Sequence, residues 1–202
     1  MAVLAPTAAP TATGTTSGNV DGQAIAITVF STVKWWGRAW LPAVFIAPKV
    51  LPKTLDTLKT LSFIHFARWT LIRELPHNGA PQPSGKLRYP HLYFESNFNG
   101  GWEEYIDAFS HILTRGMWTF WGSSYGFPKA LPTGPFKAYI KANEIEACHF
   151  YSAYPEATTT QIRRAIELEP MVADLRARAE GMSPEEFSEA FGKLVSEGQR
   201  CF

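Results

Sequence analysis

The fold is decided by residues 92–109, where LYFESNF and the turn NGG lead into WEEYIDAF. The first seven residues are rich in aromatic side chains and alternate in character, a pattern that predicts a β-strand. Trp102, Tyr105, Ile106 and Phe109 then recur at helical spacing. Two glutamates fall in the first turn of this helix, where the helix dipole favours negative charge. The stretch therefore predicts a strand that passes through a tight turn into an amphipathic helix.

Upstream of this unit the sequence predicts two further strands. Residues 24–33 and 62–72 are rich in β-branched and aromatic side chains, as strands usually are. Pro42 and Pro48 would interrupt any long helix in the segment after the first strand, so we expect an irregular apolar region there. Leucines at helical spacing then predict a helix near 51–61. Residues 76–90 contain four Pro and two Gly and are expected to form a long loop.

Downstream the sequence predicts strands and helices in turn. We expect strands at 117–122 and 147–154, and helices at 136–143, 158–168, 170–180 and 183–198. The last helix has the strongest start signal, because Ser183 and Glu186 form a capping box with Pro184 at the first helical position.

The order of the first six elements, strand–helix–strand–strand–helix–strand, matches the split βαββαβ unit of ferredoxin-like folds. We therefore expect an α+β fold with a ferredoxin-like sheet, an extra helix and strand, and C-terminal helices. The expected domains are a flexible arm at 1–22, the α+β domain at 23–168 and a helical extension at 169–202. One face of such a sheet is left open by its helices and must be covered by something else.

Three segments, SFIHFARW at 62–69, LYFESNFNG at 92–100 and FYSAYP at 150–155, resemble a largely uncharacterised bacterial family of the dimeric α+β barrel group. The resemblance extends over residues 24–168. It implies a homodimer in which the open sheet faces pack together. The group includes small monooxygenases, chlorite-dismutase-like proteins and dye-decolourising peroxidases, so an oxidoreductase role with haem follows by fold analogy alone. No haem-ligand motif is carried over to this chain.

Composition excludes several classes of protein. The chain has 202 residues with 46% hydrophobic and 14% aromatic content, which excludes a wholly disordered chain, a coiled coil and a collagen-like chain. Cys148 and Cys201 cannot make a disulfide framework, and no cysteine or histidine spacing predicts a metal site. We expect a cytoplasmic protein with no signal peptide and no membrane-spanning segment.

Charge is distributed unevenly along the chain. The net charge is +1, yet residues 34–90 carry nine Lys or Arg and only two Asp or Glu. Nucleic acid is not an expected partner, because proteins that bind it are usually basic over a whole domain. The basic segment favours an anionic partner or surface.

Candidate site residues follow from strand alternation. Tyr93, Glu95 and Asn97 share one face of the expected central strand, and apolar side chains occupy the other. The neighbouring strand offers His65 or Arg68 as a partner for the Glu95 carboxylate, since a buried carboxylate needs one. His65 and Arg68 are three positions apart, so only one can share that face, and the register is left open.

A ligand cavity on the open face is the first functional hypothesis. His149, Tyr151 and Trp121 from the two later strands would join the polar side chains of the central strand, with apolar walls and few polar groups. Glu95 or His149 would act as a base, or His149 would ligate haem iron. The protein would then bind a small apolar ligand or cofactor. The competing interpretation is structural, with Glu95 in an internal ion pair.

An interaction surface is the second hypothesis. Trp35, Trp36, Arg38 and Trp40 lie in one short segment, and tryptophan beside Lys or Arg is typical of membrane interfaces and of protein interfaces. The protein would be a non-catalytic accessory subunit of a larger assembly or a membrane-peripheral protein, docking through this segment and the arm at 1–22. Alternatively these aromatic residues cover the protein's own sheet. No motif names a reaction, so enzyme and interaction protein stay alternatives.

Overall fold

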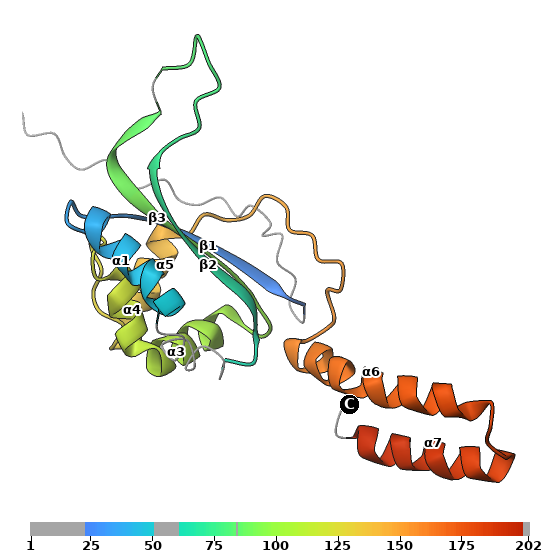
Figure 1. Ribbon diagram of the computed structural model, residues 1–202. Helices are drawn as coiled ribbons and strands as arrows, with labels where there is room; N and C mark the ends of the chain where they lie inside the picture. Colours follow the sequence, from blue (N-terminus) through green and yellow to red (C-terminus); the bar gives the residue numbers. More distant parts are fainter. Residues whose placement is uncertain (1–22, 51–60, 84, 200–202) are drawn as a thin grey trace, which may run out of the picture.

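The computed structural model describes residues 23–50, 61–83 and 85–199 (Figure 1). Its elements are β1 (Ile25–Thr32), α1 (Gly37–Val50), β2 (Ile64–Glu74), β3 (Lys86–Phe98), α3 (Trp102–Ile112), α4 (Thr114–Trp121), α5 (Thr133–Asn143), α6 (Thr159–Ala179) and α7 (Pro184–Gly198). The expected arm at 1–22 and all but the last residue of the expected helix at 51–61 lie outside the described residues.

An antiparallel three-stranded sheet with the order β1-β3-β2 forms the centre of the molecule. The α+β class is therefore confirmed, and so is the central position of the strand predicted at 92–98. That strand begins earlier than expected, at Lys86, and so shortens the loop predicted before it. β1 and β2 both run antiparallel to β3. Helix α1 lies in the connection from β1 to β2.

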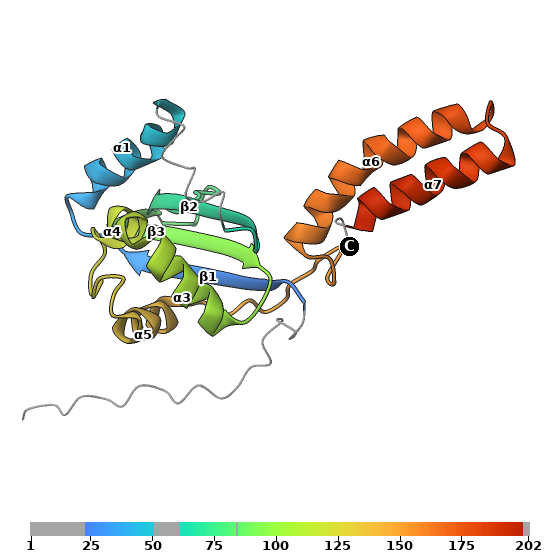
Figure 2. The ribbon, with the colours of Figure 1, turned by 90° about the horizontal axis from the view of Figure 1, so that it is seen from below.

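The buried face of β3 carries Leu92, Phe94, Ser96 and Phe98, as alternation predicted. Figure 2 shows α3 crossing this side of the sheet. Tyr105 of α3 stacks on Phe98 with ring centroids 3.7 Å apart. The aromatic side chains of α3 and α4 thus close a single core over one face, and the other face of β3 keeps its polar side chains.

The strand predicted at 117–122 is wrong, because these residues form most of α4. Met117 and Trp121 are four positions apart, on one side of the helix, and both are buried. Trp118 lies between them in sequence and is exposed. The backbone N–H of Met117 donates to the carbonyl of Leu113, the N-cap residue of α4. The burial of Met117 and Trp121 at helical spacing therefore outweighs the preference of bulky aromatic residues for strands.

The strand predicted at 147–154 is also wrong, because this segment is coil between α5 and α6. Instead, Val29 of β1 forms an isolated bridge with Glu144, and Val33, just after β1, forms another with Ser124. These short contacts cover an edge that would otherwise be open to another chain. Within the described residues the sheet has no fourth strand, so the ferredoxin-like βαββαβ unit and its barrel are not confirmed.

The irregular region expected after residue 34 is largely the helix α1, Gly37–Val50, which contains both prolines. Proline lacks the N–H that would bond the carbonyl four residues earlier. For Pro42 that carbonyl belongs to Arg38, and it accepts a hydrogen bond of 2.9 Å from Nη2 of Arg73 on β2. A side chain from the sheet therefore replaces the backbone donor that Pro42 lacks, and the helix continues.

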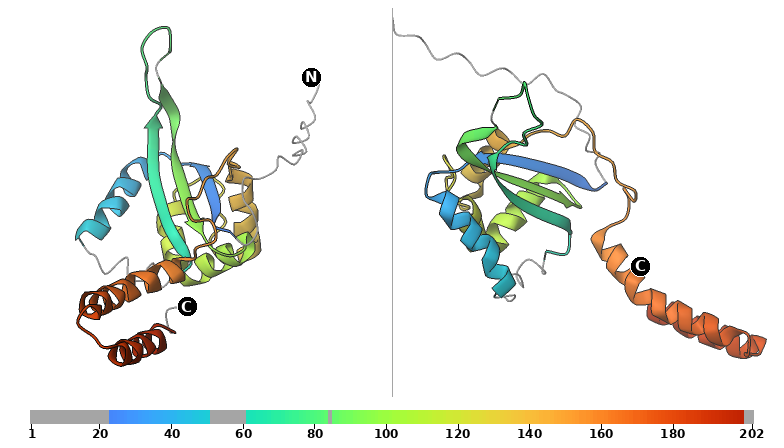
Figure 3. Two further views of the ribbon diagram at one scale, coloured as in Figure 1. Left: turned by 90° about the vertical axis from the view of Figure 1, so that its right-hand side faces the viewer. Right: turned by 45° about the horizontal axis from the view of Figure 1, so that its top comes forward.

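Helices α6 and α7 form a hairpin that extends away from the sheet (Figures 1 and 3). The two helices predicted at 158–168 and 170–180 are one helix, with Pro170 inside it, and the domain boundary expected after residue 168 falls within it. The start of α7 is confirmed, since the Ser183 backbone N–H donates to the Glu186 carboxylate at 2.8 Å and lowers its pKa. At its base the hairpin is tied to the body by Thr159, which donates to Oδ1 of Asn99.

Candidate functional site

The open face of β3 carries a compact polar cluster. Arg68 is the cross-strand partner of Glu95, and its Nη2 lies 2.5 Å from Oε2 of the carboxylate. The hydroxyl of Tyr93 donates to the same oxygen at 2.9 Å. The guanidinium of Arg68 also lies over the Tyr93 ring, 5.5 Å from its centroid. The register therefore selects Arg68, not His65, as the partner of Glu95.

The electrostatics of this cluster are those of a closed ion pair. Burial raises the pKa of the Tyr93 hydroxyl, and its hydrogen bond to Glu95 raises it further. The pKa of Arg68 is raised by its interaction with Tyr93 and then by the charge of Glu95. Tyr93 thus keeps its proton and Arg68 its charge at neutral pH. Both donors are directed at the Glu95 carboxylate, which is the arrangement of a satisfied pair.

His65 and Asn97 do not extend the cluster into a site. The β2–β3 register shifts between Ile64 and Phe66, which makes His65 the extra residue of a β-bulge. Among the described residues, neither Nε2 of His65 nor Oδ1 of Asn97 has a hydrogen-bond partner, although both atoms are buried. The register places His65 beside the Phe66–Asn97 pair, but within the described residues these two atoms are not hydrogen-bonded to the Arg68–Glu95 pair.

Trp121, His149 and Tyr151 do not join the polar face. Trp121 packs on the opposite side of the sheet, edge-on to Phe94 with ring centroids 5.0 Å apart. His149 and Tyr151 are exposed on the coil after α5. An exposed coil histidine outside the sheet does not fit a haem pocket built on that sheet. The expected ligand cavity is therefore not assembled by this set of residues.

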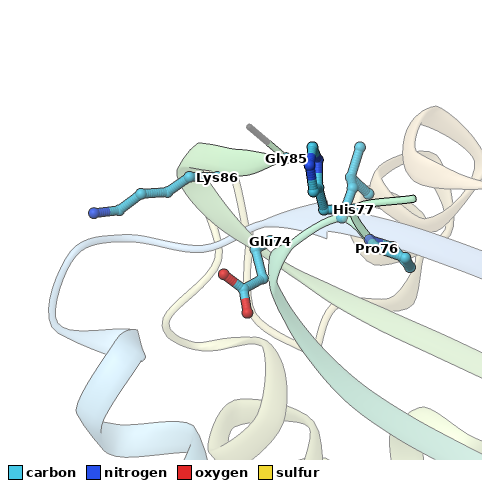
Figure 4. A pocket seen from close by; sticks show the side chains of 6 residues that line it. Glu74, Pro76, His77, Gly85 and Lys86 are labelled. Carbon is cyan, nitrogen blue, oxygen red and sulfur yellow. The ribbon is translucent and has the colours of Figure 1, made fainter. Parts of the chain in front are cut away.

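An open hollow of about 730 Å³ lies where β2 and β3 meet the loop that joins them. Its lining is Glu74, Leu75, Pro76, His77, Gly85 and Lys86. Figure 4 shows the side chains of Glu74, His77 and Lys86 pointing in different directions, so no polar groups converge on one bound atom. Among residues 23–50, 61–83 and 85–199, no group of three or more His, Cys, Asp or Glu is placed to hold a metal ion.

Helix α1 has a second apolar stripe on its outer side. Leu41 and Phe45 face inward and pack against the core. Ala39, Ala43 and Ile46 recur at helical spacing on the other side and are exposed, with Ile46 at 56%. A surface helix normally carries polar residues there. Among residues 23–50, 61–83 and 85–199, no element covers the outer side of α1, which is an apolar surface in this part of the chain.

Helix α4 continues this apolar surface. Nε1 of Trp40 donates to the backbone carbonyl of Thr119 at 2.9 Å, which fixes α1 against α4. The Trp40 ring meets Trp118 edge-on with centroids 6.4 Å apart, and Trp118 is 57% exposed. Trp35, just before α1, is 80% exposed, whereas Trp36 is half-buried. We define the tryptophan face as Trp35, Ala39, Trp40, Ala43, Ile46 and Trp118.

The two helices of the tryptophan face carry basic residues and no acidic ones. Neither α1 nor α4 contains an Asp or Glu, and the chain has none from 108 to 143. Arg38 of α1 and Arg115 of α4 are both exposed. Sequence reasoning found Trp35, Trp36, Arg38 and Trp40 but missed Trp118. The absence of acidic residues around Trp118 was the available signal.

None of the described helices is long and apolar enough to span a bilayer. Comparison of the chain with protein-family models, with curated proteins and with solved structures finds no match, so its function is inferred from its own geometry.

Proposed function

We propose that the protein is a non-catalytic interaction protein that binds anionic membrane surfaces peripherally through the tryptophan face. The observation that carries the proposal is the outer stripe of α1, which is apolar and exposed and is joined by Trp118 of α4. Large exposed apolar patches on monomeric proteins usually mark interaction sites.

The chemistry of this face suits the boundary between lipid headgroups and acyl chains. Tryptophan is enriched at that depth because its ring is apolar and its N–H is polar. Ile46 and the two alanines would enter the apolar layer, as the apolar side of an interfacial helix does. Arg38 and Arg115 would remain at headgroup level, where each basic residue contributes about 1 kcal/mol of attraction to an anionic leaflet.

The charge pattern favours a membrane over a protein partner. Protein interfaces usually match positive groups on one side with negative groups on the other, and both signs occur at their rims. The segments that form the tryptophan face carry positive charge only. A lipid surface of uniform negative charge complements such a face without requiring a defined register.

The first hypothesis, a small apolar ligand on the sheet face, has less support. Its candidate base Glu95 is held by Arg68 and Tyr93, and its other candidate residue His149 lies on an exposed coil. Those two positions do not form one reaction centre.

Cosedimentation with vesicles tests the proposal. The full chain is mixed with vesicles of phosphatidylcholine alone, or of phosphatidylcholine with phosphatidylglycerol. We expect binding to the mixed vesicles that weakens as salt is added, because salt screens the attraction of Arg38 and Arg115. Equal binding to both vesicle types, or binding to neither, would contradict the proposal and leave a protein partner as the better account of this face.

A further inference from the structure

The α6–α7 hairpin has a face that its own two helices cannot bury. Leu175 is the buried residue of α6, and Gly198 is the buried residue of α7. Phe187 and Phe191 stack with ring centroids 6.1 Å apart and remain exposed. Figure 1 shows the hairpin projecting from the body, so the sheet does not cover it.

Helical periodicity places the exposed apolar side chains on one side of the hairpin. Successive residues advance about 100° around a helix. On α6, Val172 therefore lies beside the inward-facing Leu168 and Leu175, on one flank. On α7, Phe191 and Val195 lie on a flank beside the inward-facing Leu194. Because the helices are antiparallel, these two flanks meet on the same side.

The opposite side of the hairpin is polar. It carries the Asp174–Arg178 ion pair of α6, and Glu186 and Lys193 of α7 occupy the corresponding flank. The hairpin is thus amphipathic as a unit. We call the side with Val172, Phe191 and Val195 the hairpin face.

A groove runs along α6 at the edge of the hairpin face. Its lining is Ala165, Leu168, Glu169, Val172, Ala173, Arg176, Ala177 and Glu180. Small side chains allow another helix to approach closely at this place. Glu169 and Arg176 are both exposed and have opposite charges.

The hairpin face is complementary to itself. Glu169 and Arg176 lie at equal distances along α6 on either side of the point between Val172 and Ala173. A second α6 packed antiparallel at that point would place each Glu169 opposite the other copy's Arg176. This is the defining property of a two-fold interface, in which residue i meets j and j meets i.

Helix α7 has its centre at the same level. A Cβ built on Gly198 would lie 3.2 Å from Cδ1 of Leu168, so these two residues are side by side. The two helices are antiparallel, so a step forward along α6 from Leu168 matches an equal step back along α7 from Gly198. The point between Val172 and Ala173 therefore lies level with residues 193–194 of α7. Phe191 and Val195 flank that level. The same axis would therefore place Phe191 of one copy against Val195 of the other.

We propose that two copies of the chain associate through their hairpin faces into an antiparallel four-helix bundle. The occupant of the hairpin face is a second copy, selected by the opposite charges of Glu169 and Arg176 and by the shared axis of the two helices. This is the architecture in which paired helices bury a common apolar face. It differs from the dimer that the family resemblance implied, which used the sheet, and it does not depend on membrane binding.

Charge reversal of the full chain tests this inference. The wild type is expected to sediment at twice the 22.5 kDa chain mass at micromolar concentration. The variants Glu169→Arg and Arg176→Glu are made separately. Each places like charges opposite one another at both ends of the α6 pair, so each is expected to weaken dimerisation by about tenfold or more. The double variant restores both pairs and is expected to dimerise as the wild type does.

Mixing the two single variants gives the sharpest result. A chain with Glu169→Arg and a chain with Arg176→Glu complement one another, so a heterodimer should form at concentrations at which each chain alone is mostly monomeric. Glu167→Arg, on the polar side of α6, is the matched control and should leave the dimer intact. Circular dichroism checks that helix content is unchanged. A monomeric wild type, single variants that dimerise normally, or a mixture that stays monomeric would overturn the inference.

Discussion

Trp121→Ala is expected to lower the free energy of unfolding by about 3–5 kcal/mol, as large-to-small changes of buried aromatic residues do. Trp121 is 1% exposed, and its ring lies edge-on to Trp69 and Phe94 of the sheet. Removing the indole leaves a cavity where α4 meets the core. Urea unfolding followed by circular dichroism measures the loss.

Trp118→Ala is the matched control in the same helix. Because Trp118 is 57% exposed, we expect a change below about 1 kcal/mol. The pair therefore tests which of the two indoles α4 buries. A larger loss at Trp118 than at Trp121 would contradict the packing of Trp121 in the core.

Ile46→Glu is expected to weaken binding to vesicles that contain phosphatidylglycerol by roughly 10- to 100-fold. The change removes an apolar side chain from the outer stripe of α1, and it adds a negative charge that the anionic headgroups repel. Because Ile46 is 56% exposed in the free protein, the fold should be unaffected. Cosedimentation at constant salt measures the change.

Ile145→Glu is the control for that result. Ile145 is 53% exposed, so the chemical change and the initial exposure are nearly the same, but the residue lies on the coil after α5. Binding of this variant should equal that of the wild type. An equal loss for both variants would show that net charge alone governs binding, and it would remove the tryptophan face from the account.

Local patterns predicted the part of the fold where one side of each element is buried. Alternation at residues 92–98 placed Phe94 and Phe98 in the core and left Glu95 on the other face, as observed. The same patterns failed at 117–122, where a run of bulky aromatic residues suits a strand and a buried helix alike. They failed at 147–154 because the edge of β1 is bridged by other residues, a contact between distant segments that no local pattern encodes.

The sequence predicted the polar pair on the sheet in part and missed the helical stripe on α1. The pairing of Glu95 with either His65 or Arg68 followed from alternation, but the choice depended on a β-bulge beside Ile64. The outer stripe of α1 was missed because Pro42 argued against a helix. The compensating donor, Arg73, lies on another strand, and its contact with Arg38 is visible only in the folded chain.

Placing a spin label on the tryptophan face tests the account most directly. Ile46→Cys is labelled in a chain that also carries Cys148→Ser and Cys201→Ser, and Ile145→Cys in the same background is the control. With vesicles that contain phosphatidylglycerol, the label at position 46 should gain exposure to oxygen and lose exposure to a water-soluble relaxation agent. The label at position 145 should stay exposed to water. A label at position 46 that remains as accessible to water with vesicles as without them would contradict membrane binding through this face.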